Sequence, residues 1–366
     1  MNSIYYYRGL LWKELRENAR LFGLAFVLIS WQNLFYPVFN WLLMGGETFD
    51  KWSSTLLAIM NPNALDTSFM VQIGIMISIA IGVLILSHER SGSLEYLVST
   101  PVNRKEIIIS KFMSGSLALA CIMFINAAVV VLVLTLRPVA LVSKAMVIGW
   151  SFSIAIAWIC IFTLSLLAST LCRNYAVAGL ATLFMVTLPG MITQFACQIA
   201  THYFDASEKA ALRIYNSMKH VDLWALLAMK NPREADSVDA SGSFFIGTTS
   251  HGIWDETQNY FTMNNEVLFH LVELTALTIV FLALAVWLFS RSPLERKEDW
   301  LMFGHFKHVA IIFVTFLIAL QQSLDRAGSF LEFIGFFVLL FTLIYLIFIL
   351  LSRFFGLFRI HEWMGR

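Results

Sequence analysis

Charged residues are scarce in this sequence. Only 13% of its 366 residues are charged, while 58% are hydrophobic. Soluble domains carry about twice that share of charge, so an aqueous globular fold is excluded. The formal net charge of +1 gives no reason to expect a nucleic-acid partner or an acidic substrate. In such a chain the positions of the charges matter more than their sum.

Cysteine and the common catalytic motifs are also scarce. The four cysteines lie in or at the end of apolar runs, without metal-like spacing, and are interpreted as small buried hydrophobic residues; they are Cys121, Cys160, Cys172 and Cys197. The sequence contains no G-x-x-x-x-G-K-[ST], H-E-x-x-H or G-x-S-x-G motif. We therefore expect no ATP site of the Walker type, no metal, no catalytic residue and no cofactor within this chain. The charged first 20 residues do not resemble a cleavable signal peptide.

Long apolar runs dominate what is present. A membrane helix needs about 20 mainly apolar residues. Six runs are clear, a seventh is short and an eighth follows; they are Leu21–Met44, Ser68–Ser87, Ile107–Leu136, Ala145–Leu171, Tyr175–Ala200, Val267–Ser290, Val309–Gln321 and Phe330–Leu351. The sequence therefore predicts an all-α polytopic membrane protein with about eight crossings.

The distribution of lysine and arginine predicts the orientation. With the N-terminus inside and every run crossing, 16 of the 25 basic residues fall on the inner side, and five of the remaining nine lie in the long 201–265 segment. Because positive residues in short loops favour the cytoplasm, we expect both termini to be cytoplasmic and 201–265 to be extracytoplasmic. The predicted location is the cell membrane.

Polar residues inside the apolar runs need a structural or functional reason. Gln194 and Gln198 lie in the fifth run, while His270 and Glu273 share a face of the sixth with Glu266. These residues either hydrogen-bond within the bundle or line a water-filled path, so Gln194, Gln198, His270 and Glu273 are candidates for a translocation path. Pro189-Gly190 predicts a kink or a break in the fifth helix.

Small residues recur at four-residue spacing in two of the predicted helices. Gly74, Ser78 and Gly82 form one stripe, and Gly149, Ser153 and Ala157 form another. Such stripes let helix backbones approach closely. Packing within the chain and packing between subunits both fit this pattern.

Two segments on the inner side are more than connectors. Tyr7–Arg20 has an apolar line at Leu11, Leu15 and Ala19, and Lys13 and Glu17 are spaced to pair on its polar face, which predicts an amphipathic helix at the membrane surface. The second segment, His88–Lys111, reads HERSGSLEYLVSTPVNRKEIIISK. It contains a charged Gly/Ser turn, a short amphipathic stretch, a proline and a basic pair.

This second segment resembles the loop between helices two and three of ABC-2 type (type V exporter-like) ABC transporter permeases. The residues that carry the resemblance are Glu89, Arg90, Gly92, Leu94, Glu95, Leu97, Thr100, Pro101 and Arg104. The N-terminal Leu11–Arg16 stretch resembles the elbow helix of the same family, through Lys13, Glu14 and Arg16.

The resemblance implies a six-helix core in residues 1–290 and the permease subunit of an exporter, which separate ATPase subunits drive through alternating access. It also implies two permease chains, identical or different, and two cytoplasmic ATPase subunits that bind ATP and Mg. Residues 88–111 would couple the two parts, with Ser93–Ser99 as a coupling helix.

The expected domain organisation follows from these segments. It comprises an elbow helix (1–20), a transmembrane domain (21–290) with the coupling segment (88–111) and an external cap (201–265), a linker (291–308), two further transmembrane helices (309–352) and a tail (353–366). The alternative function is a polytopic membrane enzyme or sensor without an ATPase partner. Purification with or without a stoichiometric ATPase would separate the two.

Overall fold

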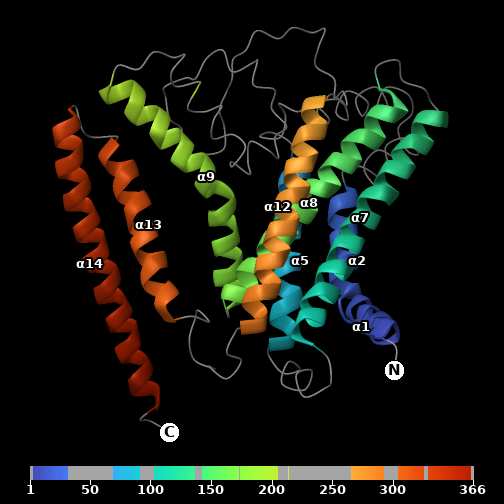
Figure 1. Cartoon of the computed structure of the whole chain (residues 1–366), viewed down its shortest axis with the longest axis horizontal. Coiled ribbons are helices and arrows are strands. Elements are labelled where there is room, and N and C mark those ends of the chain that lie inside the picture. The colour runs from blue at the N-terminus through green and yellow to red at the C-terminus, as the bar shows by residue number, and fades with distance from the viewer. Residues whose placement is uncertain are drawn as a thin grey trace. The chain divides into compact units, whose positions relative to one another are not determined.

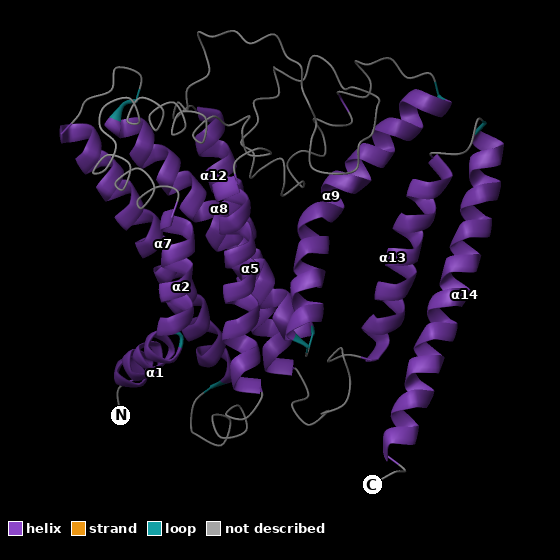
Figure 2. Ribbon diagram, turned by 180° about the vertical axis from the view of Figure 1, so that it is seen from behind, coloured by secondary structure: helices purple, strands orange, loops and turns teal. Residues whose placement is uncertain are grey.

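The computed structural model describes residues 3–31, 69–90, 103–136, 142–172, 174–204, 213, 265–291, 304–324 and 329–363. These residues are helical almost throughout (Figures 1 and 2). For these residues the predicted all-α fold class of a polytopic membrane protein is confirmed.

The described helices follow the apolar runs of the sequence. They are α1 (Ser3–Glu17), α2 (Ala19–Ser30), α5 (Phe69–Arg90), α7 (Arg104–Leu136), α8 (Lys144–Leu171), α9 (Tyr175–Tyr203), α12 (Asn265–Arg291), α13 (Gly304–Leu324) and α14 (Phe330–Trp363). Among the described residues, five helical stretches are long and apolar enough to cross a membrane, in α7, α8, α9, α12 and α14. Ala19–Ser30 and Gln72–Leu86 are shorter apolar stretches. The total of eight crossings stays a prediction.

The chain divides into two compact units. The first comprises Met1–Gly190 and Lys219–Met302, and the second comprises Met191–Met218 and Phe303–Arg366. The boundary between the two units falls within α9 after Gly190, the residue that follows Pro189, and α9 continues as a helix through this proline. The predicted break at Pro189 is therefore not observed, while a kink there stays a prediction.

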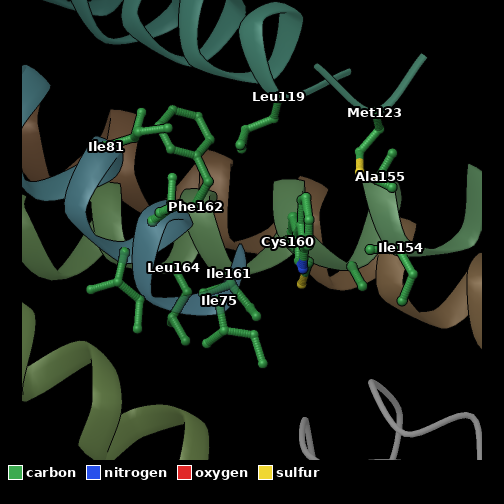
Figure 3. Packing of buried hydrophobic residues seen from close by; sticks show 14 of the residues in the cluster. Ile75, Ile81, Leu119, Met123, Ile154, Ala155, Cys160, Ile161, Phe162 and Leu164 are labelled. Carbon is green, nitrogen blue, oxygen red and sulfur yellow. The ribbon is translucent and has the colours of Figure 1, made fainter. Parts of the chain in front are cut away.

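Helix α8 forms the centre of the first unit and packs against α5, α7 and α12. Every residue from Cys160 to Thr170 is buried. The hydroxyl groups in this stretch tolerate burial because they donate to carbonyls of their own helix, as Ser165 Oγ does to Phe162 O at 2.8 Å. Figure 3 shows Phe162 of α8 packed among side chains that include Ile81 of α5 and Leu119 of α7.

The small-residue stripe of α5 packs against α8. A Cβ atom on Gly74 would lie 1.9 Å from the ring of Trp158, and one on Gly82 would lie 2.7 Å from the carbonyl oxygen of Phe162. The α8 hydroxyl of Ser165 donates to Ser78 O at 3.4 Å, which adds a polar contact across the same interface. Packing within the chain is thus the observed role of this stripe.

The small-residue stripe of α8, formed by Gly149, Ser153 and Ala157, also packs within the first unit. Ser153 and Ala157 are buried, and Gly149 is half-buried. Ser153 Oγ donates to Gly149 O at 2.9 Å, so the hydroxyl is satisfied within its own helix.

The second unit contains the α13–α14 helix pair. Aromatic side chains follow one another along α14 at four-residue spacing, with ring centroids 6.3 Å apart for Phe333 and Phe337 and 6.0 Å apart for Phe337 and Phe341. Phe316 of α13 packs edge-on against Phe337 at 5.3 Å. These contacts form an aromatic seam, and α14 itself extends past the predicted crossing to Trp363.

Gly82→Ala tests the close approach of α5 and α8. The added methyl group would meet the backbone of Phe162, which cannot move as a side chain can, so we expect a loss of about 1–3 kcal/mol in the free energy of unfolding. Thermal unfolding of the purified protein in detergent measures this. The matched control is Gly179→Ala in α9, where a Cβ would have no neighbour within 4 Å. Equal stability of the two variants would contradict the packing described here.

Candidate functional site

A buried ion pair joins three helices of the first unit. Lys111 Nζ of α7 donates to both carboxylate oxygens of Glu14 in α1, at 3.2 and 3.1 Å, and to the carbonyl oxygen of Ile85 in α5 at 3.1 Å. The side chains of Lys111 and Glu14 are only 0% and 1% exposed. The three N–H groups of the ammonium thus have three acceptors, as a buried lysine requires.

The start of α7 determines where Lys111 lies. Asn103 precedes the helix, its carbonyl oxygen accepts from Glu106 N at 2.9 Å, and the Glu106 carboxylate accepts from Asn103 N at 3.4 Å. The bond to the Glu106 carboxylate is the half of a capping box in which the third helical residue reaches back to the start of the helix. Lys111 follows Arg104 by about 10 Å of helix rise and shares the buried face with Ile107 and Ser114.

Asn18 supports the other half of the pair. It lies between α1 and α2, and its side-chain Nδ2 donates to the Glu14 backbone carbonyl at 2.9 Å and to the Glu14 carboxylate at 3.4 Å. Its own carbonyl accepts from Phe22 N at 3.0 Å at the start of α2. One asparagine therefore connects the two helices and orients the carboxylate that receives Lys111.

The buried face of α1 differs from what its apolar line would suggest. Glu14 and Asn18 are buried, whereas Leu11 and Leu15 are half-buried and Trp12 is 62% exposed. The helix is thus attached to the bundle at polar groups, and part of its apolar surface remains exposed.

The other two predicted elbow residues lie on the outer part of α1. Lys13 pairs with Glu17 at 3.5 Å, which confirms the predicted i,i+4 pair, and both side chains are substantially exposed. The Arg16 guanidinium lies over the ring of Trp12, 5.2 Å from its centroid. Of Lys13, Glu14 and Arg16, only Glu14 is buried against the bundle.

Most of the predicted coupling residues lie outside the described part of the chain. These are Gly92, Leu94, Glu95, Leu97 and Pro101. Glu89 and Arg90 are the last two residues of α5, described for their backbone alone, and Arg104 is the half-buried first residue of α7. Their role in coupling stays a prediction, as does the external cap, most of which is also outside the described residues.

A second polar contact lies on α12. His270 Nδ1 and Glu273 Oε2 are 3.3 Å apart; the histidine is buried and the carboxylate side chain is 19% exposed. The contact gives the Glu273 carboxylate a polar neighbour within the same helix. Gln194 and Gln198 belong to the second unit, so their predicted association with Glu273 stays a prediction.

Lys111 is a site residue that the sequence patterns above do not single out. It lies inside the apolar run Ile107–Leu136. A lysine at such a position needs a charged or polar partner. That rule could have singled it out, although it could not have named Glu14. Among the described residues, no group of three His, Cys, Asp or Glu side chains is arranged to hold a metal ion.

Glu14→Ala is expected to destabilise the first unit strongly. It leaves the Lys111 ammonium buried without its carboxylate, a change that costs about 3–5 kcal/mol in comparable sites. Glu17→Ala removes an exposed pair on the same helix and should cost less than about 1 kcal/mol. Thermal unfolding in detergent compares the two variants. A loss for Glu14→Ala no larger than that for Glu17→Ala would show that the pair is not a buried one.

Comparison with known proteins agrees with the resemblance found in the sequence. The family model described as ABC-2 family transporter protein matches residues 44–294, which is more than half of the chain. Among curated proteins, no significant match is found. The matched region includes α5, α7, α8, α9 and α12, while α1 and α2 precede it. The chain belongs to the ABC-2 family of transporter proteins, as a multi-pass membrane component.

Proposed function

We propose that this chain is the permease subunit of an ABC exporter. Separate cytoplasmic ATPase subunits bind ATP and Mg, two permease chains form the transmembrane assembly, and ATP hydrolysis drives alternating access. Family membership supports the transport role and does not favour the alternative of an enzyme or sensor. The observation that carries the coupling mechanism is the Lys111 contact to Glu14 and Ile85.

That contact lies near both ends of residues 91–103, the part of the proposed coupling segment 88–111 that connects α5 and α7. Ile85 is close to the end of α5 at Arg90, and Lys111 is close to the start of α7 at Arg104. A bond from Lys111 Nζ to Ile85 O therefore connects the two helices that enter and leave residues 91–103. A force applied to this segment by an ATPase would reach α5 and α7 together.

The coupling element itself is Ser93–Ser99. Leu94, Leu97 and Val98 fall at i, i+3 and i+4, so a helix here would present them on one apolar face to a groove of the ATPase. Glu95 would lie on the neighbouring face, available to a basic group of the partner. Pro101 would end this helix before α7 begins.

Both termini are placed in the cytoplasm and residues 201–265 outside. Two Trp–Arg pairs of the first unit support the cytoplasmic side for the N-terminus, because tryptophan favours the membrane interface and arginine favours its cytoplasmic side. Arg16 lies over Trp12 on α1, and Arg291 lies over Trp287 at the end of α12, 4.4 Å from the ring centroid. Figure 1 shows α1 and the C-terminal end of α12 at the same end of the first unit.

The translocation path is proposed to include Gln194, Gln198, His270 and Glu273. The close approach of His270 and Glu273 supports it, since a carboxylate in a membrane-spanning helix is costly unless polar groups surround it. Such a pair would present both hydrogen-bond donors and acceptors to a substrate.

Leu97→Asp tests the coupling segment. A charge on the docked apolar face should weaken association with the ATPase and abolish ATP-dependent transport, while the permease still inserts into the membrane. Ser99→Asp adds the same charge on the neighbouring polar face and is the matched control. Recovery of the ATPase on affinity purification and transport into inverted vesicles are measured. Wild-type values for Leu97→Asp would overturn the coupling assignment.

Glu273→Gln tests the translocation path. The amide keeps the size of the side chain but removes its charge, so transport should fall by about tenfold or more while the amount of protein in the membrane stays normal. Thr275→Val, two residues away on α12, is the control, because the Thr275 hydroxyl donates to Leu271 O of its own helix at 2.7 Å. Loss of protein in parallel with loss of transport would instead indicate a purely structural role for Glu273.

A further inference from the structure

We infer that Glu14 and Lys111 are positioning residues that make α1 a moving part of the coupling unit. This inference rests on the proposed function. The ATPase would act on residues 91–103, and the ion pair would transmit the resulting displacement of α5 and α7 to α1. The family model begins at residue 44 and assigns nothing to α1.

The contacts of Lys111 connect α1 directly to both helices that flank the coupling segment. The ammonium donates to the Glu14 carboxylate on α1 and to the Ile85 carbonyl on α5, and it belongs to α7 itself. One side chain thus reaches all three helices. Figure 2 shows α1 beside the end of the bundle where α5 ends and α7 begins.

The geometry of the pair restricts how α1 can move. Two N–H···O bonds to one carboxylate, with Asn18 Nδ2 as a further donor to Glu14, constrain both the position and the rotation of α1. An apolar contact has little directional preference, whereas charge-assisted hydrogen bonds depend on the distance and direction between donor and acceptor. The pair therefore favours movement of α1 together with α7.

The helices that carry Lys111 and Ile85, α7 and α5, are packed closely against α8. Gly115 of α7 lies against Phe162 of α8, where an added Cβ would approach the ring to 2.3 Å, and Gly82 of α5 lies against the backbone of the same residue. Close packing leaves α5 and α7 little freedom to yield separately against α8. A displacement of their inner ends would accordingly be passed on to α1.

The opposite side of α1 is available to the membrane surface. Trp12 is 62% exposed and Arg16 lies over its ring, a combination suited to the lipid headgroup region. With Glu14 and Asn18 facing the bundle and Trp12 and Arg16 facing away, α1 can transmit movement between the bundle and the inner leaflet.

Three variants of the pair test the inference in the permease–ATPase complex. Glu14→Gln removes one charge; the double variant Glu14→Gln/Lys111→Met removes both and leaves no unpaired charge; Glu14→Lys/Lys111→Glu reverses the pair. We expect the double neutral variant to insert and to retain the ATPase, but to transport about tenfold less per ATP hydrolysed. Reversal turns a carboxylate toward the Ile85 carbonyl oxygen and an ammonium toward Asn18 Nδ2, so the reversed pair should transport no better than the double neutral variant. Glu17→Gln, which changes the exposed pair on α1, should resemble wild type.

A spectroscopic measurement on the permease without the ATPase tests whether α1 stays attached to α7. Spin labels at Gly9 of α1 and Met113 of α7, two exposed positions, report the distance between the helices in a chain whose four cysteines are replaced by alanine. We expect one narrow distance distribution in the parent chain and a broad one in the double neutral variant. In the complex, the parent distribution should stay narrow with and without ATP.

The outcomes separate the two proposals. The inference would be overturned if the double neutral variant transported as much per ATP as wild type and kept a narrow distribution of spin-label distances. This holds even where the ATPase binds and transport is ATP-dependent. Absence of a bound ATPase and of ATP-dependent transport in the parent chain would instead overturn the proposed function. Should Glu14→Gln fail to accumulate in the membrane, the double neutral variant decides the matter.

Discussion

A lysine and a glutamate buried together join three helices at one end of the first unit. Removing two charges from water is costly, so the arrangement is stable only because each donor of Lys111 has an acceptor and Asn18 supports the Glu14 carboxylate. The same contacts hold α1 beside the two helices that flank residues 91–103. The inferred transmission of movement to α1 rests on this arrangement.

The ion pair depends in turn on helix packing deeper in the first unit. Glycines at positions 74, 82 and 115 let α5 and α7 approach α8 so closely that a single methyl group would collide with Trp158 or Phe162. Serine and threonine hydroxyls are accommodated because they bond to carbonyls of their own or neighbouring helices. The result is a closely packed bundle centred on α8, with the Glu14–Lys111 pair buried at one end of it.

Local patterns in the sequence were enough to predict the helices, the all-α class and the Lys13–Glu17 pair, because each of these depends on residues close together in the chain. The resemblance of His88–Lys111 to ABC-2 permeases led to the family that the comparison shows. The Glu14–Lys111 pair could not be predicted in this way, since its partners are 97 residues apart and no periodicity relates them. For the small-residue stripe of α5, the pattern left two alternatives open, and only the position of Trp158 and Phe162 decided between them.

Site-specific photo-crosslinking at Leu97 tests the central claim most directly, namely that an ATPase engages the segment between α5 and α7. A photoreactive residue placed at position 97 in native membranes should crosslink to a cytoplasmic ATPase, and one placed at Ser237 should not. The predicted result is an ATPase crosslink from the photoreactive residue at position 97, and none from the chain in which Leu97 is unchanged. A crosslink to the ATPase from position 237, with none from position 97, would contradict the account.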